Sequence, residues 1–386
     1  MTYASGRTYY DADSHIVELP DHLKRHADPD ARDAVPDLSF DVGSAWEDTV
    51  ARLIETRSHT EQHRADLIAQ GDDLLRGPKM FDALGAFDPE ERSTALDLLG
   101  FERQLVFASF STQPVFDRSL DADTRYSNAT LHNRAMDEFT RGDERLMGVG
   151  AVALDDPERA VAELDHLLRL GLATVWIPHR DCGGRSPGHD DFDPFWARLQ
   201  EARVPFVLHV GGDALRIDPV WTNNGRAAPT DWLGGGENIR GKDMTALHHG
   251  PERFVGILVL DGVFERFPRL TGAAVELGAG YVPAMLHRLD WIHQIWRRSE
   301  PELAAFTRKP SEQLTEQFAF TPFVYEDVGA LIRQSNPDLY LFSSDYPHVE
   351  GGRDPIGRFE GTLTGLDATV HDRFYSENFA RVFDVS

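Results

Sequence analysis

Cysteine, lysine and long apolar runs are all scarce in this sequence of 386 residues. The single cysteine, Cys182, excludes an intramolecular disulfide and is typical of a reducing compartment. No apolar run approaches the ~18 residues needed to cross a bilayer, and the first residues lack the basic and then apolar pattern of a secretory leader. We therefore expect a cytoplasmic protein.

Basic residues are also outnumbered, because 39 lysines and arginines stand against 64 aspartates and glutamates. The resulting net charge of −25 disfavours nucleic acid and anionic membranes as partners, since both select basic surfaces. A small-molecule substrate is compatible with this charge, even an anionic one, because a bound cation and a few arginines can reverse the local field. The hydrophobic content of 41% indicates a globular protein with a sizeable core.

Strand-like and helix-like segments alternate along most of the chain, which predicts parallel β-α-β units. Eight such strands predict a (β/α)8 TIM barrel, with the active site at the C-terminal ends of the strands. We expect one metal-dependent domain over residues 1–386, with a helical insert at about residues 20–100 that covers the site or forms an oligomer contact. Apolar spacing also predicts a helix over residues 251–267. The expected strands are residues 7–10, 104–109, 146–152, 173–178, 205–209, 270–276, 316–320 and 339–345.

Three of these strands end in residues that can bind a metal ion. Asp13 and His15 follow the first strand, and in an extended chain they project on the same side. His209 ends the fifth strand and Asp345 ends the eighth. Because all strand ends of a barrel face one mouth, we expect these side chains to meet. Their mixture of carboxylate and imidazole suits zinc, manganese or iron.

Further candidates follow other strands or lie in a long loop. Glu276, after the sixth strand, could hold a second metal ion, act as an acid or base, or pair with an arginine such as Arg288. His179, after the fourth strand, would contact substrate if it faces the mouth. His348 could bind substrate or cap a turn. The loop of residues 211–243 could select the substrate or form an oligomer contact, through Trp221, Trp232 and Arg226.

The ordered set of motifs resembles the amidohydrolase superfamily. It comprises Asp13-x-His15, His209, the run from Gly262 to Pro268, and the run from Ser344 to His348. The chain is similar in particular to the amidohydrolase-related group that includes the aminocarboxymuconate semialdehyde decarboxylase-like enzymes. The resemblance implies a metal-dependent barrel with Asp13, His15, His209 and Asp345 as ligands, and association as a homo-oligomer such as a dimer.

Two positions depart from the pattern of that family. Many members have His-x-His where this chain has Asp13-x-His15, and an acidic first ligand is similar to the manganese-using decarboxylases of the group. Members often end the sixth strand with a histidine that handles protons, whereas Glu276 stands near that position here. The resemblance therefore implies one divalent metal ion, or two if Glu276 binds a second.

Our first hypothesis is a metal-dependent hydrolase of a small ester, thioester, lactone or amide. A metal-bound water would lose its proton to Asp345 and attack the carbonyl, while Glu276 or His179 assists the leaving group. The alternative is metal-dependent, non-oxidative decarboxylation of a hydroxylated aromatic or unsaturated acid, in which an acid protonates the carbon. Glu276 in place of the family histidine favours hydrolysis. A metal-free binding or scaffold barrel is a third hypothesis.

Overall fold

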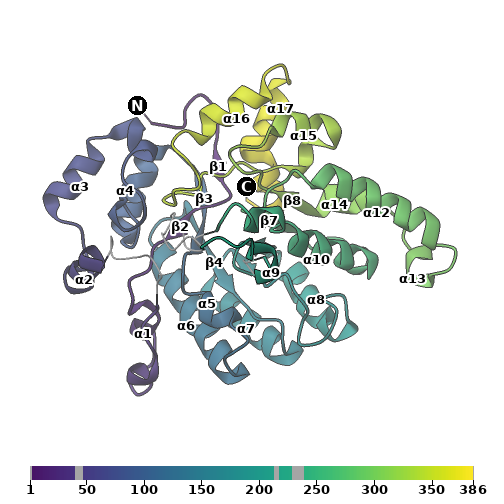
Figure 1. Cartoon of the computed structure of the whole chain (residues 1–386), viewed down its shortest axis with the longest axis horizontal. Coiled ribbons are helices and arrows are strands. Elements are labelled where there is room, and N and C mark those ends of the chain that lie inside the picture. Colours follow the sequence, from purple (N-terminus) through teal and green to yellow (C-terminus); the bar gives the residue numbers. More distant parts are fainter. Residues whose placement is uncertain (1, 40–46, 213–216, 228–238, 386) are drawn as a thin grey trace.

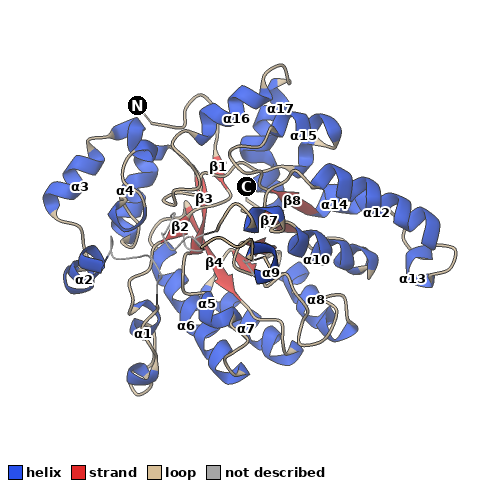
Figure 2. Ribbon diagram, in the orientation of Figure 1, coloured by secondary structure: helices blue, strands red, loops and turns tan. Residues whose placement is uncertain are grey.

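A curled parallel sheet forms the centre of the molecule, and helices surround it (Figures 1 and 2). The computed structural model describes residues 2–39, 47–212, 217–227 and 239–385. The hydrogen-bonded strand order is β1-β3-β4-β5-β6-β7-β8, and β2 also pairs with β3. The strands are β1 Tyr10–Asp11, β2 His15–Ile16, β3 Arg103–Ala108, β4 Leu146–Ala151, β5 Thr174–Trp176, β6 Phe206–His209, β7 Gly272–Val275 and β8 Phe318–Phe320.

The first strand of the barrel is interrupted. β1 pairs with the start of β3 and β2 pairs with its end, both in parallel. The strand predicted over residues 7–10 therefore pairs only from Tyr10 onward and resumes at His15. Asp13 therefore lies in the interruption between β1 and β2, and His15 is the first residue of β2. Pairing with β3 on both sides of the interruption holds this part of the chain.

An irregular segment fills the eighth position of the barrel, where we predicted a strand over residues 339–345. On one side Leu341 donates its N–H to the carbonyl of Phe320, and on the other the carbonyl of Phe342 accepts from Ala12, both at 3.0 Å. The segment is not a regular strand, because the N–H of Ser344 bonds to the Asp11 carboxylate instead of to a neighbouring strand. These bonds close the circle, and the parallel strands with surrounding helices fit the predicted TIM-barrel fold.

Two sequence expectations about element ends need correction. The helix predicted over residues 251–267 is broken into α10 His249–Leu260 and α11 Val263–Arg266, because Gly262 between them has φ +73° and leaves the helical region. The strand predicted from residue 316 begins at Phe318, since residues 316 and 317 are the last two of helix α14 Pro310–Gln317.

The described residues between β2 and β3 form four α-helices, which stand to one side of the barrel (Figure 1). That this segment is an insert serving the mouth of the site stays a prediction. These helices are α1 His22–Arg25, α2 Glu47–Thr56, α3 Glu61–Ile68 and α4 Pro89–Leu99. The other helices are α5 Gln113–Phe116, α6 Ala122–Thr140, α7 Pro157–Leu170, α8 Asp193–Ala202, α9 Pro219–Thr222, α12 Val282–Trp296, α13 Pro301–Ala304, α15 Val328–Gln334, α16 Pro355–Leu363, α17 Ala368–Asp372 and α18 Asn378–Phe383.

Alternation along the strands separates an inner core from an outer one. In β3 the side chains of Leu105 and Phe107 pack inside the barrel, whereas Val106 and Ala108 pack against the helices. The inner cluster also contains Trp176 and fills the barrel below the strand ends. The mouth therefore rests on a packed floor. Among the described helices, none is long and apolar enough to cross a membrane.

Candidate metal centre and active site

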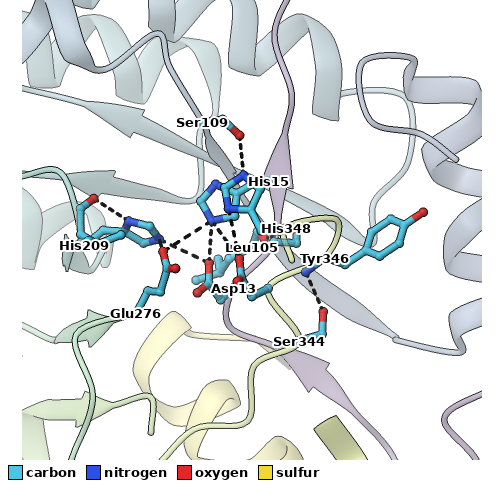
Figure 3. A network of polar contacts seen from close by, with 12 residues as sticks. Asp13, His15, Leu105, Ser109, His209, Glu276, Ser344, Tyr346 and His348 are labelled. Atoms are coloured by element: carbon cyan, nitrogen blue, oxygen red, sulfur yellow. Dashed lines mark hydrogen bonds and ion pairs between the residues drawn. The ribbon is translucent and has the colours of Figure 1, made fainter. Parts of the chain in front are cut away.

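Four buried side chains bring their donor atoms within 4.8 Å of one another at the mouth of the barrel (Figure 3). We call them the donor set: Asp13, His15, His209 and Glu276. Nε2 of His209 lies 3.4 Å from Oδ1 of Asp13 and 3.4 Å from Oε2 of Glu276. Nε2 of His15 lies 3.3 Å from the same Asp13 oxygen. Two imidazoles and two carboxylates in such a group are ligands for a divalent metal ion, in agreement with the predicted cofactor.

Asp345 and His348 adjoin the donor set and form a second group with His15. Oδ1 of Asp345 lies 3.5 Å from Nε2 of His15 and 3.4 Å from Nδ1 of His348. The Nε2 atom of His15 has one lone pair and binds one ion, so the two groups are neighbouring parts of one site. The structure thus brings together all the metal ligands predicted from the sequence.

Backbone carbonyls orient both imidazoles of the donor set. Nδ1 of His15 lies 3.3 Å from the carbonyl of Ala108, and Nδ1 of His209 lies 2.9 Å from the carbonyl of Val210. Because a carbonyl only accepts, each Nδ1 carries the proton and each Nε2 presents its lone pair to the other donors. This is the arrangement in which histidine ligands are fixed by the groups behind them.

A serine fixes the third imidazole. Oγ of Ser109 lies 2.6 Å from the carbonyl of Ile16 and 2.7 Å from Nε2 of His348. The hydroxyl donates its only proton to the carbonyl, so it must accept a hydrogen bond from the Nε2–H of His348. Nδ1 of His348 then faces Asp345. The ring is completely buried, which places it behind Asp345 instead of in contact with solvent.

Burial and neighbouring charges set the protonation of the site. Burial raises the pKa of Asp13, but hydrogen bonds and charges from His15 and His209 outweigh it and hold the pKa below its ordinary value. Burial, and then the charge of Asp13, raise the pKa of Asp345 to about 7. Burial lowers the pKa of His15 and of His348 to about 4. At neutral pH the site therefore combines neutral imidazoles at His15 and His348, a charged Asp13 and an Asp345 that can hold a proton.

Two of the carboxylate residues at the site have an unusual backbone conformation. Glu276 and Asp345 each have φ of +53°, in the left-handed region that side chains other than glycine rarely adopt. The N–H of Asp345 donates to the carbonyl of Asp13 at 2.9 Å, which ties the turn to the first strand. Non-glycine residues held in this region cluster at functional sites, because surrounding contacts must maintain them.

A buried arginine supports the first strand from outside the barrel. Arg92 of α4 donates from Nε to the carbonyl of Gly85 at 2.8 Å and from Nη1 to Oε1 of Gln104 at 3.1 Å. Its Nη2 donates to the carbonyl of His15. Gln104 in turn donates to Asp11 at 2.8 Å. The helical segment is therefore bonded directly to a residue of the donor set.

Two further charged residues at the site were missed by the sequence reasoning. The carboxylate of Glu18 accepts backbone N–H bonds from Ser109 at 3.0 Å and Ser111 at 2.8 Å, which holds the loop after β3. Nζ of Lys79 is buried without a hydrogen-bond partner among the described residues, and its charge acts on Asp345. Glu18 interrupts an otherwise apolar run, which is a signal that could have been used. Lys79 lies far from any strand end in sequence and carries no such signal.

The remaining predicted residues lie at different distances from the donor set. His179 is buried beside the turn after β6, where a Cβ built on Gly212 would lie 2.9 Å from its Nδ1. Burial, and then the charges of His209, Arg253 and Arg180, lower its pKa to about 3. Trp221 is 69% exposed on α9, and Arg226 is exposed nearby. Trp232 lies outside the described residues. Roles for these side chains stay predictions.

Comparison with known proteins identifies the family. A family model described as Amidohydrolase matches residues 15–385. The chain belongs to the amidohydrolase family. This confirms the resemblance that the motifs indicated, and the match covers the barrel from β2 onward together with the helical segment between β2 and β3.

Several relatives of this amidohydrolase are decarboxylases by name. The gamma-resorcylate decarboxylase of Rhizobium radiobacter is 25% identical over 220 residues, which cover 55% of this chain and 62% of the relative, less than two thirds of its length. An amidohydrolase of Mycobacterium avium subsp. paratuberculosis has the same fold, with a TM-score of 0.72, 23% identity and coverage of 98% and 100%. The 5-carboxyvanillate decarboxylase of Novosphingobium aromaticivorans, solved with manganese and 4-hydroxy-3-methoxy-5-nitrobenzoic acid, has a TM-score of 0.61, 19% identity and coverage of 99% and 97%.

The hydrolase hypothesis is therefore wrong, because the names of these relatives support the decarboxylase alternative. It rested on Glu276 standing where the family often has a histidine. In the structure Glu276 belongs to the donor set, so it does not distinguish one reaction from the other. Both reactions use the same kind of metal centre, and the sequence pattern identified only that centre.

Proposed function

We propose that this amidohydrolase is a metal-dependent carboxy-lyase, which removes CO2 from a hydroxylated aromatic acid without oxidation. The observation that carries the proposal is the position of Asp345, a buried carboxyl with a pKa of about 7 directly beside the donor set. A decarboxylase needs such a group to deliver a proton to carbon near neutral pH. The names of the relatives support the same reaction.

Asp13, His15, His209 and Asp345 would hold the divalent ion, with Glu276 beside them. When bound, the ion supplies a positive charge that orients the substrate carboxylate and an adjacent hydroxyl. Manganese suits a site rich in carboxylate oxygen, and the relative from Novosphingobium aromaticivorans was solved with manganese. Asp13, charged at neutral pH, would add its carboxylate to the Nε2 lone pairs of the two imidazoles around the ion.

The side chains of the protein then supply one proton to the substrate. The bond between the ring carbon and the carboxylate breaks, CO2 leaves, and the electron pair stays on the ring carbon. The carboxyl proton of Asp345 passes to that carbon, and solvent restores it after product leaves. His348 and Ser109 hold Asp345 in position through the 3.4 Å and 2.7 Å contacts. Burial of all three keeps bulk water away from the reacting carbon.

The remaining predictions from the sequence also belong to this proposal. His179 would contact substrate at the mouth, as would Trp221, Trp232 and Arg226 of the loop. An unsaturated acid with a hydroxyl group near its carboxylate is the second substrate class. A single domain, a cytoplasmic location and a homodimer stay predictions.

The test is CO2 release by protein loaded with Mn²⁺ from a panel of hydroxybenzoic acids, with the phenol product identified by mass spectrometry. We expect release from at least one acid with a hydroxyl adjacent to the carboxylate, loss of release after chelation, and recovery when Mn²⁺ returns. The His209→Asn variant should lose metal and activity together, while His287→Asn on the exposed face of α12 should keep both. A fully metal-loaded enzyme that releases no CO2 from the panel would contradict the proposal.

A further inference from the structure

Helix α12 lies at the outer edge of the molecule, with α13 beyond its end (Figure 1). Three large apolar side chains near its C-terminus are exposed to solvent: Trp291 by 48%, Ile295 by 53% and Trp296 by 40%. The rings of Trp291 and Trp296 lie 6.2 Å apart, so the two tryptophans belong to one patch. Exposed apolar patches of this kind mark surfaces that bind another molecule.

The patch continues into a stripe with the spacing of a helix-to-helix contact. Ala284, Arg288, Trp291 and Ile295 follow one another at steps of four, three and four residues, and all of them are exposed. Such a heptad spacing places side chains on one face that a second helix can cover. The charge of Arg288 does not oppose this contact, because Glu252 of α10 pairs with it. The outer face of α12 therefore suits a helical partner.

The charge of this face favours a second copy of the chain. The net charge is −25, so two copies repel each other wherever acidic surfaces meet. Helix α12 contains one acidic residue, Asp290, whose carboxylate accepts the N–H and the hydroxyl of Ser311 at 2.9 and 2.7 Å. Arg297 and Arg298 follow the helix and are exposed. Two copies can therefore approach each other here without that repulsion.

A groove along the same helix carries charges of both signs. Two hollows of about 350 and 550 Å³ adjoin each other beside α12, because His287 and Asp290 line both of them. Glu312 lines the hollow beside the first half of the helix, whereas Arg297 and Lys309 line the hollow beside the second half. If two copies pack with antiparallel α12 helices about a two-fold axis, the basic half of each groove meets the acidic half of the other.

We propose that the outer face of α12 joins two copies of this chain about a two-fold axis, with Trp291 and Ile295 at the centre of the contact. The self-complementary order of charge in the groove favours a second copy over a partner of another kind. The proposal goes beyond the proposed function, since it needs neither metal nor substrate. It also places the contact on a different face from the helical segment and from the loop of residues 211–243, which were the two alternatives from the sequence.

Sedimentation of the whole chain at micromolar concentration tests the proposal. We expect the wild type to be a dimer, or an assembly built from such dimers. Trp291→Glu and Ile295→Glu should each raise the dissociation constant of the dimer by roughly thirtyfold or more, as expected when a central apolar contact is lost. Both side chains are exposed, so circular dichroism should show an unchanged fold.

Matched control variants place the same charge on the two alternative faces. Ile68 is exposed on α3 of the helical segment, and Trp221 is exposed on α9 of the loop. Neither Ile68→Glu nor Trp221→Glu should change the dissociation constant. A dimer that persists in both α12 variants, or that dissociates only in a control variant, would overturn the proposal. A monomeric wild type would overturn it as well, and binding of that monomer to anionic phospholipid vesicles through Trp291 would assign the patch to a membrane.

A thiol cross-link tests the geometry of the contact. Cys182 is the only cysteine of the chain and is buried, so an introduced surface cysteine is the accessible thiol. In the Gln294→Cys variant the two-fold axis would bring two thiols together beside Trp291, and a short bis-maleimide should join two copies covalently. Gln62→Cys, on the exposed side of α3, should stay uncross-linked. A dimer that does not cross-link at position 294 would contradict an antiparallel contact on α12.

Discussion

The imidazoles of His15 and His348 lie face to face, with ring centroids 3.8 Å apart and planes inclined by 17°. Two rings this close cannot both carry a positive charge without strong repulsion. Each is held neutral with a defined tautomer, one by the carbonyl of Ala108 and the other by the hydroxyl of Ser109. Ser109 in the loop after β3 therefore fixes the ring of His348, and stacking of the two rings helps to fix His15 in the donor set.

Removing the hydroxyl of Ser109 should loosen His348 and, through it, Asp345. We expect Ser109→Ala to lower kcat by about tenfold, which corresponds to one lost buried hydrogen bond, with little change in KM. The matched control is Ser111→Ala, which removes a 2.8 Å bond between a buried serine and Nδ1 of His132, away from the donor set. Equal kcat values for the two variants would show that Ser109 has no positioning role.

Asp345→Asn should abolish turnover while leaving the fold intact, because an amide cannot deliver the proton that the ring carbon needs. A general acid contributes on the order of 10² to 10⁴ in rate, so we expect a loss in that range. Asp367→Asn, an exposed residue before α17, is the control of equal charge. Thermal unfolding checks the fold, and retained turnover in Asp345→Asn would exclude this carboxyl as the acid.

The same carboxyl sets the direction of the pH profile. Burial and the charge of Asp13 raise the pKa of Asp345 to about 7, and the acid works only in its protonated form. The divalent ion of the loaded enzyme lowers this pKa, so the rate should be highest at acidic pH and fall as the pH rises through the lowered value. The residual rate of the Asp345→Asn variant should not change with pH over the same range. A rate that rises through neutral pH would point to a base in its place.

Arg92→Lys should lower the free energy of unfolding by roughly 2–4 kcal/mol, because a single ammonium cannot reach the carbonyls of Gly85 and His15 together with Gln104. The unpaired carbonyls would remain buried. Arg64→Lys on the exposed side of α3 should change little. Denaturant unfolding of metal-free protein measures the difference, and equal stabilities would mean that Arg92 contributes no net support.

The buried pair of His59 and Glu91, in the helical segment between β2 and β3, makes the stability of the protein depend on pH. Burial opposes a charge on His59, but the Glu91 carboxylate at 2.8 Å and the carbonyl of Phe81 raise its pKa above the ordinary value. A raised pKa contributes stability that is complete below the unfolded value of about 6.5 and is lost as the pH rises through the folded value. His59→Asn should therefore destabilise the protein most at acidic pH, and the gap from the wild type should narrow as the pH rises. A gap independent of pH would contradict this pairing.

The sequence predicted that these candidate ligands would converge, because each follows an apolar strand and the strand ends of a barrel face one mouth. Asp13, His15, His209 and Asp345 needed no knowledge of the packing between strands. The irregular eighth segment could not be predicted in the same way. Its N–H groups donate hydrogen bonds to the carboxylate of Asp11 and to the carbonyl of Phe374, which are both remote in sequence. A pattern of apolar residues contains no information about such bonds.

The residues that support the donor set, such as Arg92 and Ser109, could not be predicted from the sequence for a related reason. Arg92 and Ser109 reach the site from elements whose sequences read as an ordinary amphipathic helix and an ordinary loop start. Their importance arises from hydrogen bonds to backbone carbonyls, and every residue has such a carbonyl. The reaction was misjudged because a metal centre of this kind serves both hydrolysis and decarboxylation, and one substituted position does not decide between them.

The left-handed backbone at Glu276 and Asp345 also restricts how this enzyme can be redesigned. Asparagine and glycine tolerate that conformation, whereas valine, isoleucine and threonine clash in it. A library built on every amino acid at these two positions would consist largely of chains that cannot form the turn. Selection for new chemistry here would do better to restrict these two positions to residues that tolerate the turn.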